Sequence, residues 1–221
     1  MEGDGKESAQ AALLRVRDLR SRIAGPFSFD LPDGECLAVL GPSGCGKTSL
    51  LRMLADLDEN SGTVMLEGRE RESWEAPAWR RQVAYHAAEA AWWQVRVDSH
   101  FSAGSLEFMR EEVTDWMAAL RLPKDLLSAE VGRLSTGERQ RLALVRTLVR
   151  TLARAPAILL LDEPTASLDQ QSVAGVEQVL RYWLRPGRGM VIVTHSEDQA
   201  GRMAGATLRL GGNAAGRHAS G

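Results

Sequence analysis

The chain lacks the features of a secreted or membrane-spanning protein. Its 221 residues include only two cysteines, Cys36 and Cys45, which excludes a disulfide framework and predicts two reduced thiols. No apolar run approaches the length of a bilayer span, and the densest, 157–161, has the length of one buried strand. The first ten residues are polar and acidic, unlike a signal peptide. We expect a cytoplasmic protein whose membrane role, if it has one, comes through a partner.

The chain also has little net charge and very little lysine. A formal net charge of -2 gives no electrostatic reason to expect binding to nucleic acid. Lys6, Lys47 and Lys124 are the only lysines, and arginine supplies the other positive charge. With 44% hydrophobic and 25% charged residues, the composition is that of a globular protein. The length suits one domain, or a core with a small inserted subdomain.

Short apolar runs alternate with helical patterns along the chain. This alternation predicts an α/β fold, with a mostly parallel sheet flanked by helices. The expected strands are 36–40, 83–85, 158–161 and 190–193, with peripheral strands at 63–66 and 207–210.

One stretch departs from this alternation. Between about 90 and 135, apolar residues fall at helical spacing without a strand pattern, which predicts an inserted helical subdomain whose apolar stripe is a packing face. We expect a folded domain over 11–210, between a disordered arm at 1–10 and a disordered tail at 211–221.

The most informative motif is GPSGCGKT, which follows the apolar run 36–40 and precedes a leucine-rich helical pattern. Backbone N–H groups of a glycine-rich turn converge on phosphate oxygens, and the following helix adds a favourable dipole. Lys47 would reach the β- and γ-phosphates, and the Thr48 hydroxyl would ligate Mg2+. The alternative is a glycine-rich turn with one solvated lysine, but lysine is otherwise scarce. The predicted nucleoside triphosphate site comprises Gly41, Pro42, Ser43, Gly44, Cys45, Gly46, Lys47, Thr48 and Ser49.

A second acidic element, ILLLDEP at 158–164, ends an apolar strand in two carboxylates. An aspartate at such a strand end holds Mg2+ in P-loop nucleotidases, which fits Asp162. Glu163 points to the other side of the extended chain and is placed to act as a general base on the attacking water. The alternative is a solvated strand end followed by a proline turn.

A third motif, LSTGERQ, opens a periodic helix. Ser135 and Glu138 have the spacing of a capping box, which is a structural explanation for both. A helix N-terminus that carries Ser and Gly is also an anion site. It would serve that purpose if it met the γ-phosphate held by another copy of the chain.

In this order the motifs resemble those of the nucleotide-binding subunit of ABC transporters, of the stand-alone bacterial type, from about residue 13 to 210. The resemblance makes 41–48 the Walker A loop, Ser135, Thr136, Gly137 and Glu138 part of the signature, and Asp162 with Glu163 the Walker B pair. It makes Ser167, Leu168 and Asp169 the D-loop, and His195 the switch histidine.

The resemblance also implies a mechanism. Lys47, Glu163 and His195 would be the catalytic residues of an ATPase. Two copies would form a head-to-tail homodimer, with two ATP molecules and Mg2+ between the Walker A loop of one and the signature of the other. Hydrolysis would drive transport through a separate transmembrane permease, at the cytoplasmic face of the inner membrane.

The sequence departs from the family pattern after the strand at 83–85. The family has a glutamine where this chain has Ala88. Gln82 precedes the strand and Gln94 comes too late, so Glu89 is the candidate that would contact Mg2+ directly or through water.

Two aromatic features also stand out. The aromatic residue that stacks on adenine in the family is absent near Arg20, so we predict that the Arg20 guanidinium takes this place, with Phe27 as the alternative. Trp92 and Trp93 fall near the family's groove for the membrane subunit. They would be interface anchors, or they would be buried in the helical subdomain.

Three other classes compete with this interpretation. A small-molecule kinase would share the phosphate loop. A soluble ABC ATPase in DNA repair or translation usually carries coiled-coil or zinc insertions or a second cassette, none of which is found. A module that traps ATP without turnover would not need Glu163 and His195. The transported substrate and the direction of transport are not encoded in these motifs.

Overall fold

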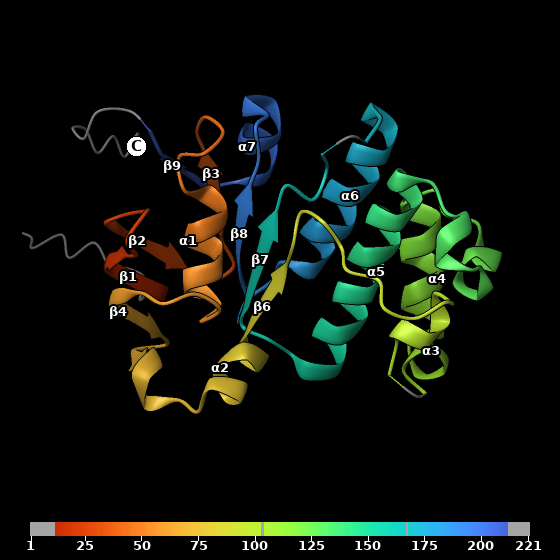
Figure 1. Cartoon of the computed structure of the whole chain (residues 1–221), viewed down its shortest axis with the longest axis horizontal. Helices are drawn as coiled ribbons and strands as arrows, with labels where there is room; N and C mark the ends of the chain where they lie inside the picture. The colour runs from red at the N-terminus through yellow and green to blue at the C-terminus, as the bar shows by residue number, and fades with distance from the viewer. Residues whose placement is uncertain (1–11, 103, 167, 212–221) are drawn as a thin grey trace, which may run out of the picture.

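The computed structural model describes residues 12–102, 104–166 and 168–211. A parallel sheet lies at the centre, an antiparallel sheet on one side and a group of helices on the other (Figure 1). The predicted arm at 1–10 and residues 212–221 of the predicted tail lie outside the described residues.

The central sheet has the order β6-β7-β8-β3-β9, and all its strands run parallel. Every residue of β3, β7 and β8 is buried, which explains why these strands are continuous apolar runs in the sequence. The strands are β3 (Cys36–Leu40), β6 (Val83–His86), β7 (Ile158–Asp162), β8 (Gly189–Val193) and β9 (Ala206–Arg209). The predicted peripheral strand at 207–210 is thus the parallel edge strand β9.

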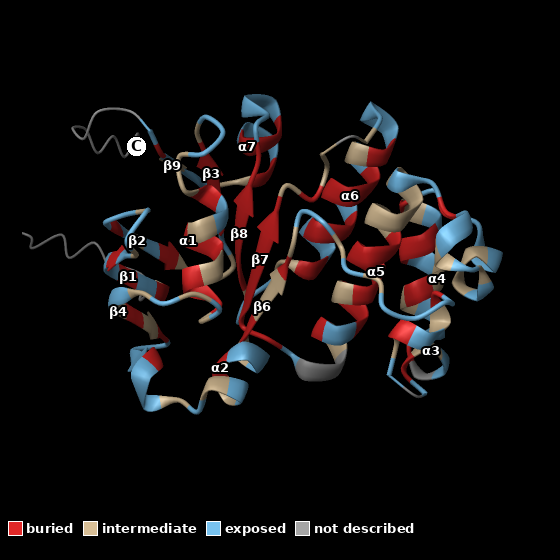
Figure 2. Cartoon of the chain, viewed as in Figure 1, coloured by how far each residue is buried: buried red, intermediate tan, exposed pale blue. Residues whose placement is uncertain are grey.

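Alternate residues of the central strands face two separate cores. On one face, Leu37, Leu160 and Val191 pack with helix α1 (Lys47–Leu54) and the antiparallel sheet. On the other face, Leu161 and Ile192 pack with the second group of helices. These helices are α5 (Thr136–Arg154), α6 (Gln170–Trp183) and α7 (Glu197–Met203). Figure 2 shows their buried surfaces turned towards the strands.

The antiparallel sheet, in the order β2-β1-β4-β5, contains three strands that the sequence patterns did not reveal, since only β4 was expected. In β1 the apolar residues are interrupted by exposed arginines such as Arg15 and Arg17, because one face of this sheet is wet. Continuous apolar runs occur in strands that are covered on both faces, which the strands of this sheet are not. The strands are β1 (Ala12–Arg20), β2 (Phe27–Pro32), β4 (Ser61–Leu66) and β5 (Arg69–Glu70).

The stretch predicted as a helical insertion contains α3 (Ser105–Phe108) and α4 (Arg110–Ala119). Val113, Trp116 and Met117 of α4 are buried in the cluster that also holds α5 and α6, so the apolar stripe is a packing face. Short 3-10 turns lie at Asp98–His100, Lys124–Ser128 and Val131–Arg133, and the remaining helix, α2 (Ala76–Gln82), precedes β6. Among the helices described, none is long and apolar enough to cross a membrane.

A titratable group is buried where β6 meets α5. His86 is 4% exposed, and its Nδ1 lies 2.9 Å from the Thr147 hydroxyl. Burial, with a smaller contribution from the nearby Arg146 charge, lowers the pKa of His86 to about 4. The unfolded chain therefore binds one more proton than the folded chain between the two pKa values.

We predict that this histidine makes the fold sensitive to acid. The unfolding free energy should fall by about 2 kcal/mol from pH 7 to pH 5, because His86 protonates in the unfolded state only. The measurement is urea unfolding of the parent and His86→Leu at both pH values. The variant should lose this part of the pH dependence, whereas the control His195→Gln, at an exposed histidine, should keep it. An unchanged pH dependence in His86→Leu would contradict the prediction.

Candidate nucleotide-binding site

The predicted site residues lie at one edge of the parallel sheet. In the register of β3, β8 and β7, Val39 is opposite Val193, and Val193 is opposite Asp162. Parallel strands that end in register deliver the loops after them to the same place. Glu163 strengthens this alignment, because its N–H donates to the carbonyl of Val193 over 3.1 Å.

The phosphate loop is tightly folded between β3 and α1. Gly46, the N-cap of α1, has a φ of 97°, a left-handed conformation that favours glycine. A Cβ on Gly41 would lie 2.5 Å from the Leu210 carbonyl oxygen, so only glycine fits there. Lys47 is 6% exposed, and its ammonium donates to the carbonyls of Gly41 and Pro42 at 2.8 and 2.9 Å. The loop thus holds its own lysine beside the exposed turn.

Asp162 is fixed by two hydroxyl groups. Its Oδ1 accepts a hydrogen bond from Thr48 Oγ1 at 3.2 Å, and its Oδ2 accepts one from Tyr85 Oη at 3.1 Å. The carboxyl residue is 2% exposed, so these bonds replace the water it gave up. Hydroxyl and carboxylate oxygens are the donors that a hard cation such as Mg2+ prefers, so Thr48 and Asp162 fit the predicted metal site.

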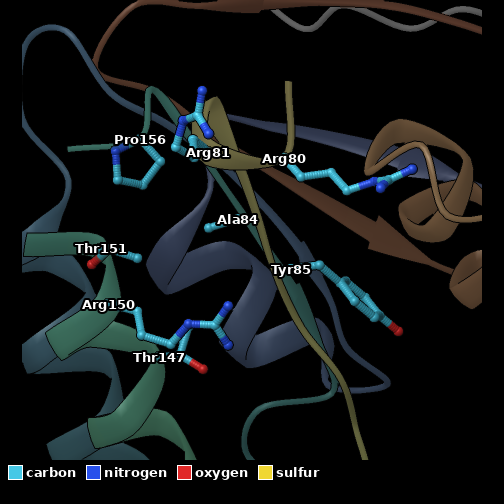
Figure 3. A pocket seen from close by; sticks show the side chains of 8 residues that line it. All are labelled: Arg80, Arg81, Ala84, Tyr85, Thr147, Arg150, Thr151 and Pro156. Atoms are coloured by element: carbon cyan, nitrogen blue, oxygen red, sulfur yellow. The ribbon is translucent and has the colours of Figure 1, made fainter. Parts of the chain in front are cut away.

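Tyr85 is a site residue that the sequence motifs missed. Burial, followed by the Asp162 charge, raises the pKa of Tyr85, which keeps its hydroxyl protonated as a donor. Figure 3 shows the Tyr85 hydroxyl pointing away from Thr147 and Arg150, which lie across β6 in a small cavity of about 60 Å³. Ala84 and Tyr85 both line this cavity, but strand alternation turns the Tyr85 hydroxyl to the other side of β6, where it meets Asp162.

Glu163 and His195 meet directly above the strand ends. His195 Nε2 lies 2.6 Å from Glu163 Oε1. Glu163 has a φ of 48°, a strained value for a residue with a side chain, and its carboxylate is partly exposed. Strain of this kind is typical of functional positions that the surrounding structure holds in place.

The signature motif forms the complete capping box predicted from its spacing. Ser135 Oγ accepts from the Glu138 N–H at 3.3 Å, and Glu138 Oε2 accepts from the Ser135 N–H at 2.8 Å. Hydrogen bonds from Ser135 lower the pKa of Glu138. Within the described part of the chain, no hydrogen bond joins Ser135, Thr136 or Gly137 to the phosphate loop.

The D-loop lies beside this helix. Asp169 caps α6 by accepting from the N–H groups of Gln171 and Ser172, both at 3.0 Å. A Cβ on Gly137 would lie 3.9 Å from Leu168, and Gln140 Nε2 donates to the Glu163 carbonyl at 3.3 Å. The α5 tip is therefore tied to the acidic strand end of its own chain. Ser167 lies outside the described residues.

The predicted adenine contacts differ in exposure. Phe27 is 7% exposed and belongs to the core under the antiparallel sheet, so its ring is not free to stack on a base. Arg20 is exposed at the end of β1, with its Nε donating to the Asp18 carbonyl at 3.3 Å. The loop after β1 reaches the phosphate loop, since a Cβ on Gly46 would lie 2.9 Å from Ala24. Arg20 keeps its place as the candidate.

Glu89 is exposed and makes no hydrogen bond or ion pair with any residue that the structure describes. The structure thus brings Thr48, Asp162, Glu163 and His195 together, and no described hydrogen bond or ion pair links Glu89 to them.

Trp92 and Trp93 were expected either to anchor an interface or to be buried in the helical subdomain, and they differ in exposure. Trp92 is partly buried and packs against the helical core, whereas Trp93 is 63% exposed. The Arg146 guanidinium lies over both rings, at 4.5 and 5.0 Å from their centroids. His100 meets both rings edge-on and accepts from the Trp93 N–H at 2.9 Å. The local fold therefore presents one ring and buries the other.

The fold and the site together define a P-loop nucleotidase. The family model described as "ABC transporter" matches residues 25–166. That span is more than half of the chain, and the chain therefore belongs to the ABC transporter family. The ATP-binding and ATPase class predicted from the motifs is confirmed.

Two curated relatives align with most of this chain. The chain is 31% identical to the "Probable iron export ATP-binding protein FetA" of Escherichia coli (strain K12), over 81% of this chain and 80% of that protein. It is 37% identical to the sulfate/thiosulfate import ATP-binding protein CysA of Burkholderia mallei (strain ATCC 23344), over 85% of this chain and 56% of the relative. The chain thus spans little more than half of CysA.

A solved structure shares the fold. It is described as the dimeric post-hydrolysis state of an ATP-binding cassette bound to ADP and Pi. The TM-score is 0.75 at 20% identity, over 89% of this chain and 94% of that one. This likeness confirms the predicted fold class.

We predict that Tyr85 tunes the metal site. Tyr85→Phe removes one hydrogen bond from Asp162, and changes of this kind behind a metal ligand cost about 10-fold to 100-fold in affinity or activity. The Mg2+ concentration for half-maximal ATPase activity should therefore rise by about tenfold. Tyr182→Phe is the matched control, because Tyr182 is 70% exposed on α6. Equal Mg2+ dependence in both variants would refute the role.

Proposed function

We propose that the chain is the motor subunit of an ABC transporter, working as a head-to-tail homodimer beneath a separate transmembrane permease. The observation that carries the proposal is the position of the Ser135 tip. This tip is the N-terminal end of the 19-residue helix α5. Within the described residues it makes no hydrogen bond to the phosphate loop of its own chain. One chain carries both halves of a composite site, and a second copy brings them together.

The catalytic roles follow from the side chains at the sheet edge. Lys47 neutralises the β- and γ-phosphates, and Glu163 orients the attacking water as a general base. His195, at 2.6 Å from the Glu163 carboxylate, fixes this base and faces the same phosphate. The strained backbone of Glu163 is consistent with a position selected for this orientation.

Mg2+ belongs to this site through Thr48 and Asp162. When bound, it neutralises charge that develops on the transferred phosphoryl group. Tyr85 donates a hydrogen bond to Asp162, and Glu89 is the residue that would contact the ion directly or through water. Arg20 supports the adenine from the end of β1.

The N-terminal tip of α5 is suited to bind a phosphate, but here the Glu138 carboxylate takes the place of that anion. Glu138 Oε2 lies 2.6 Å from Ser135 Oγ. An arriving γ-phosphate competes with Glu138 for that hydroxyl, because both are anions at the same helix N-terminus. Closure of the dimer therefore exchanges one acceptor for another at Ser135, with Thr136 and Gly137 as neighbours in the first turn and Asp169 at the same interface.

The exposed surface formed by Trp93 and Val95, which we call the tryptophan patch, supplies the permease contact. Trp93 is 63% exposed and Val95 is 73% exposed, beside the loop that follows β6. Large exposed apolar side chains of this type anchor protein interfaces. This contact would attach the motor to the cytoplasmic face of the membrane.

The cargo is recognised elsewhere. Relatives named for iron export, sulfate/thiosulfate import and taurine import match this chain at 31%, 37% and 34% identity. Proteins that serve different cargoes in both directions thus share the part that this chain contains. We propose that the permease, and not the motor, contacts the transported molecule.

We predict that Glu163→Gln separates binding from hydrolysis. Phosphate release should fall at least about 100-fold, because general base catalysis is lost, while ATP binding persists. In saturating MgATP the variant should elute as a dimer in size-exclusion chromatography with light scattering. Glu59→Gln, an exposed carboxylate outside the site, is the control and should behave as the parent. Persistent hydrolysis in Glu163→Gln would exclude the assigned base.

The composite site has its own test. Adding Ser135→Arg to the Glu163→Gln background places a bulky cation where the neighbour's phosphate would lie. This double variant should remain monomeric in MgATP while still binding the nucleotide. A dimer that forms in spite of this change, or a Glu163→Gln protein that stays monomeric, would refute the head-to-tail arrangement.

We predict that Trp93→Ala weakens permease binding without unfolding the motor. The variant should keep its melting temperature and basal ATPase activity, because the ring is mostly exposed. Co-purification with the membrane partner should fall at least about tenfold, as expected for an aromatic anchor. Tyr182→Ala, at an equally exposed aromatic residue on α6, should leave co-purification unchanged. Loss of stability with full recruitment would instead assign Trp93 a packing role.

A further inference from the structure

The start of α7 contains a buried amide in an unusual environment. Gln199 is 1% exposed, and its Oε1 accepts hydrogen bonds from Thr194 Oγ1 at 2.7 Å and Thr165 Oγ1 at 3.0 Å. Its Nε2 is buried and has no hydrogen-bond partner among the residues that the structure describes. An unsatisfied buried amide is costly, so a residue retained under these conditions needs an explanation.

Helix capping does not explain it. Ser196 and Gln199 have the spacing of a capping box, and Ser196 Oγ accepts from the Gln199 N–H at 3.1 Å. In a complete box the Gln199 side chain would return to the Ser196 N–H. That N–H instead donates to Thr194 Oγ1 at 3.1 Å. By contrast, the capping box formed by Ser135 and Glu138 is complete.

The two threonines belong to two different loops of the site. Thr194 directly precedes His195, and Thr165 follows Glu163 by two positions. One amide oxygen therefore ties the loop after β8 to the loop after β7. The two loops carry the side chains that meet at 2.6 Å, Glu163 and His195.

We infer that Gln199 is a positioning residue that sets the contact between Glu163 and His195 by tying together one threonine from each of the two loops. Because it is buried and bonded to the two threonines, it acts through the two loops. This inference rests on the proposed roles of Glu163 and His195 in ATP hydrolysis. A misplacement of about 1 Å at a catalytic group is enough to cost up to about 100-fold in rate.

The test compares Gln199→Met, which has similar volume but no acceptor, with Gln199→Glu, which keeps an acceptor for both hydroxyls. We expect Gln199→Met to lower kcat by about tenfold with the KM for ATP within about twofold, because the phosphate loop is untouched. Gln199→Glu should retain kcat within about threefold. Asp198→Asn, the exposed neighbour on α7, is the control. Unchanged kcat in Gln199→Met would overturn the inference.

A second readout separates positioning from general destabilisation. The chain has four histidines, so the imidazole NMR signals of isotope-labelled protein are few and His195 is assigned with His195→Gln. Gln199→Met should shift the His195 ring signal and leave those of His86 and His100 in place. Lowered kcat with an unmoved His195 signal, or with all histidine signals altered, would refute positioning.

Two further variants distinguish a failure of the positioning role from misfolding and from a failure of the catalytic assignment. If Gln199→Met fails to fold, Thr165→Val removes a single hydroxyl of the tie and should give the same kcat loss and His195 shift in a smaller amount; an unchanged kcat there would overturn the inference. Glu163→Gln is measured alongside. If it hydrolyses ATP normally, the proposed catalytic assignment fails. If it is inactive and Gln199→Met behaves as the parent, only the positioning role fails.

Discussion

The in-register hydrogen bonding of β3, β8 and β7 is the constraint on which the site depends. It aligns Val39, Val193 and Asp162, so that the three loops that follow begin at one edge of the sheet. A slip of one residue in β7 would turn Asp162 to the other face and exchange it with Glu163. The fully buried sequences of these strands oppose such a slip, since both faces are covered by apolar cores. The apolar packing that stabilises the sheet therefore also fixes the positions of the site residues.

The sequence revealed the parts of this fold that leave a local signature. Continuous apolar runs identified β3, β7 and β8 because those strands are covered on both faces. The phosphate loop, the Ser135 capping box and the order of the acidic and histidine motifs were also readable, because each is a short segment whose residue types follow from its chemistry. The strands β1 and β2 escaped because polar side chains occupy their wet face, arginines in β1 and Ser28 and Asp30 in β2.

What escaped prediction depends on contacts between distant segments. Tyr85 and Asp162 are separated by 77 positions, and the sequence next to Tyr85 does not indicate that its hydroxyl contacts a carboxylate. Gln199 is harder, because its spacing from Ser196 favours a local cap that the structure replaces with a tie between two loops. Trp92 and Trp93 are adjacent and chemically identical, and only the packing around them decides which is exposed. Tertiary neighbours, and not local pattern, set these roles.

Strand β6 has a mechanical consequence beyond its place at the sheet edge. Its neighbours Tyr85 and His86 point to opposite faces, one bonded to Asp162 and the other to Thr147 on the signature helix. One short strand therefore links the carboxylate of Asp162, at the predicted Mg2+ site, to helix α5, which carries the signature motif. After β6 the chain continues directly into the segment that ends in the tryptophan patch. If a partner binds the tryptophan patch, as we propose, a displacement of that segment would act on both of these contacts through the one strand that carries them.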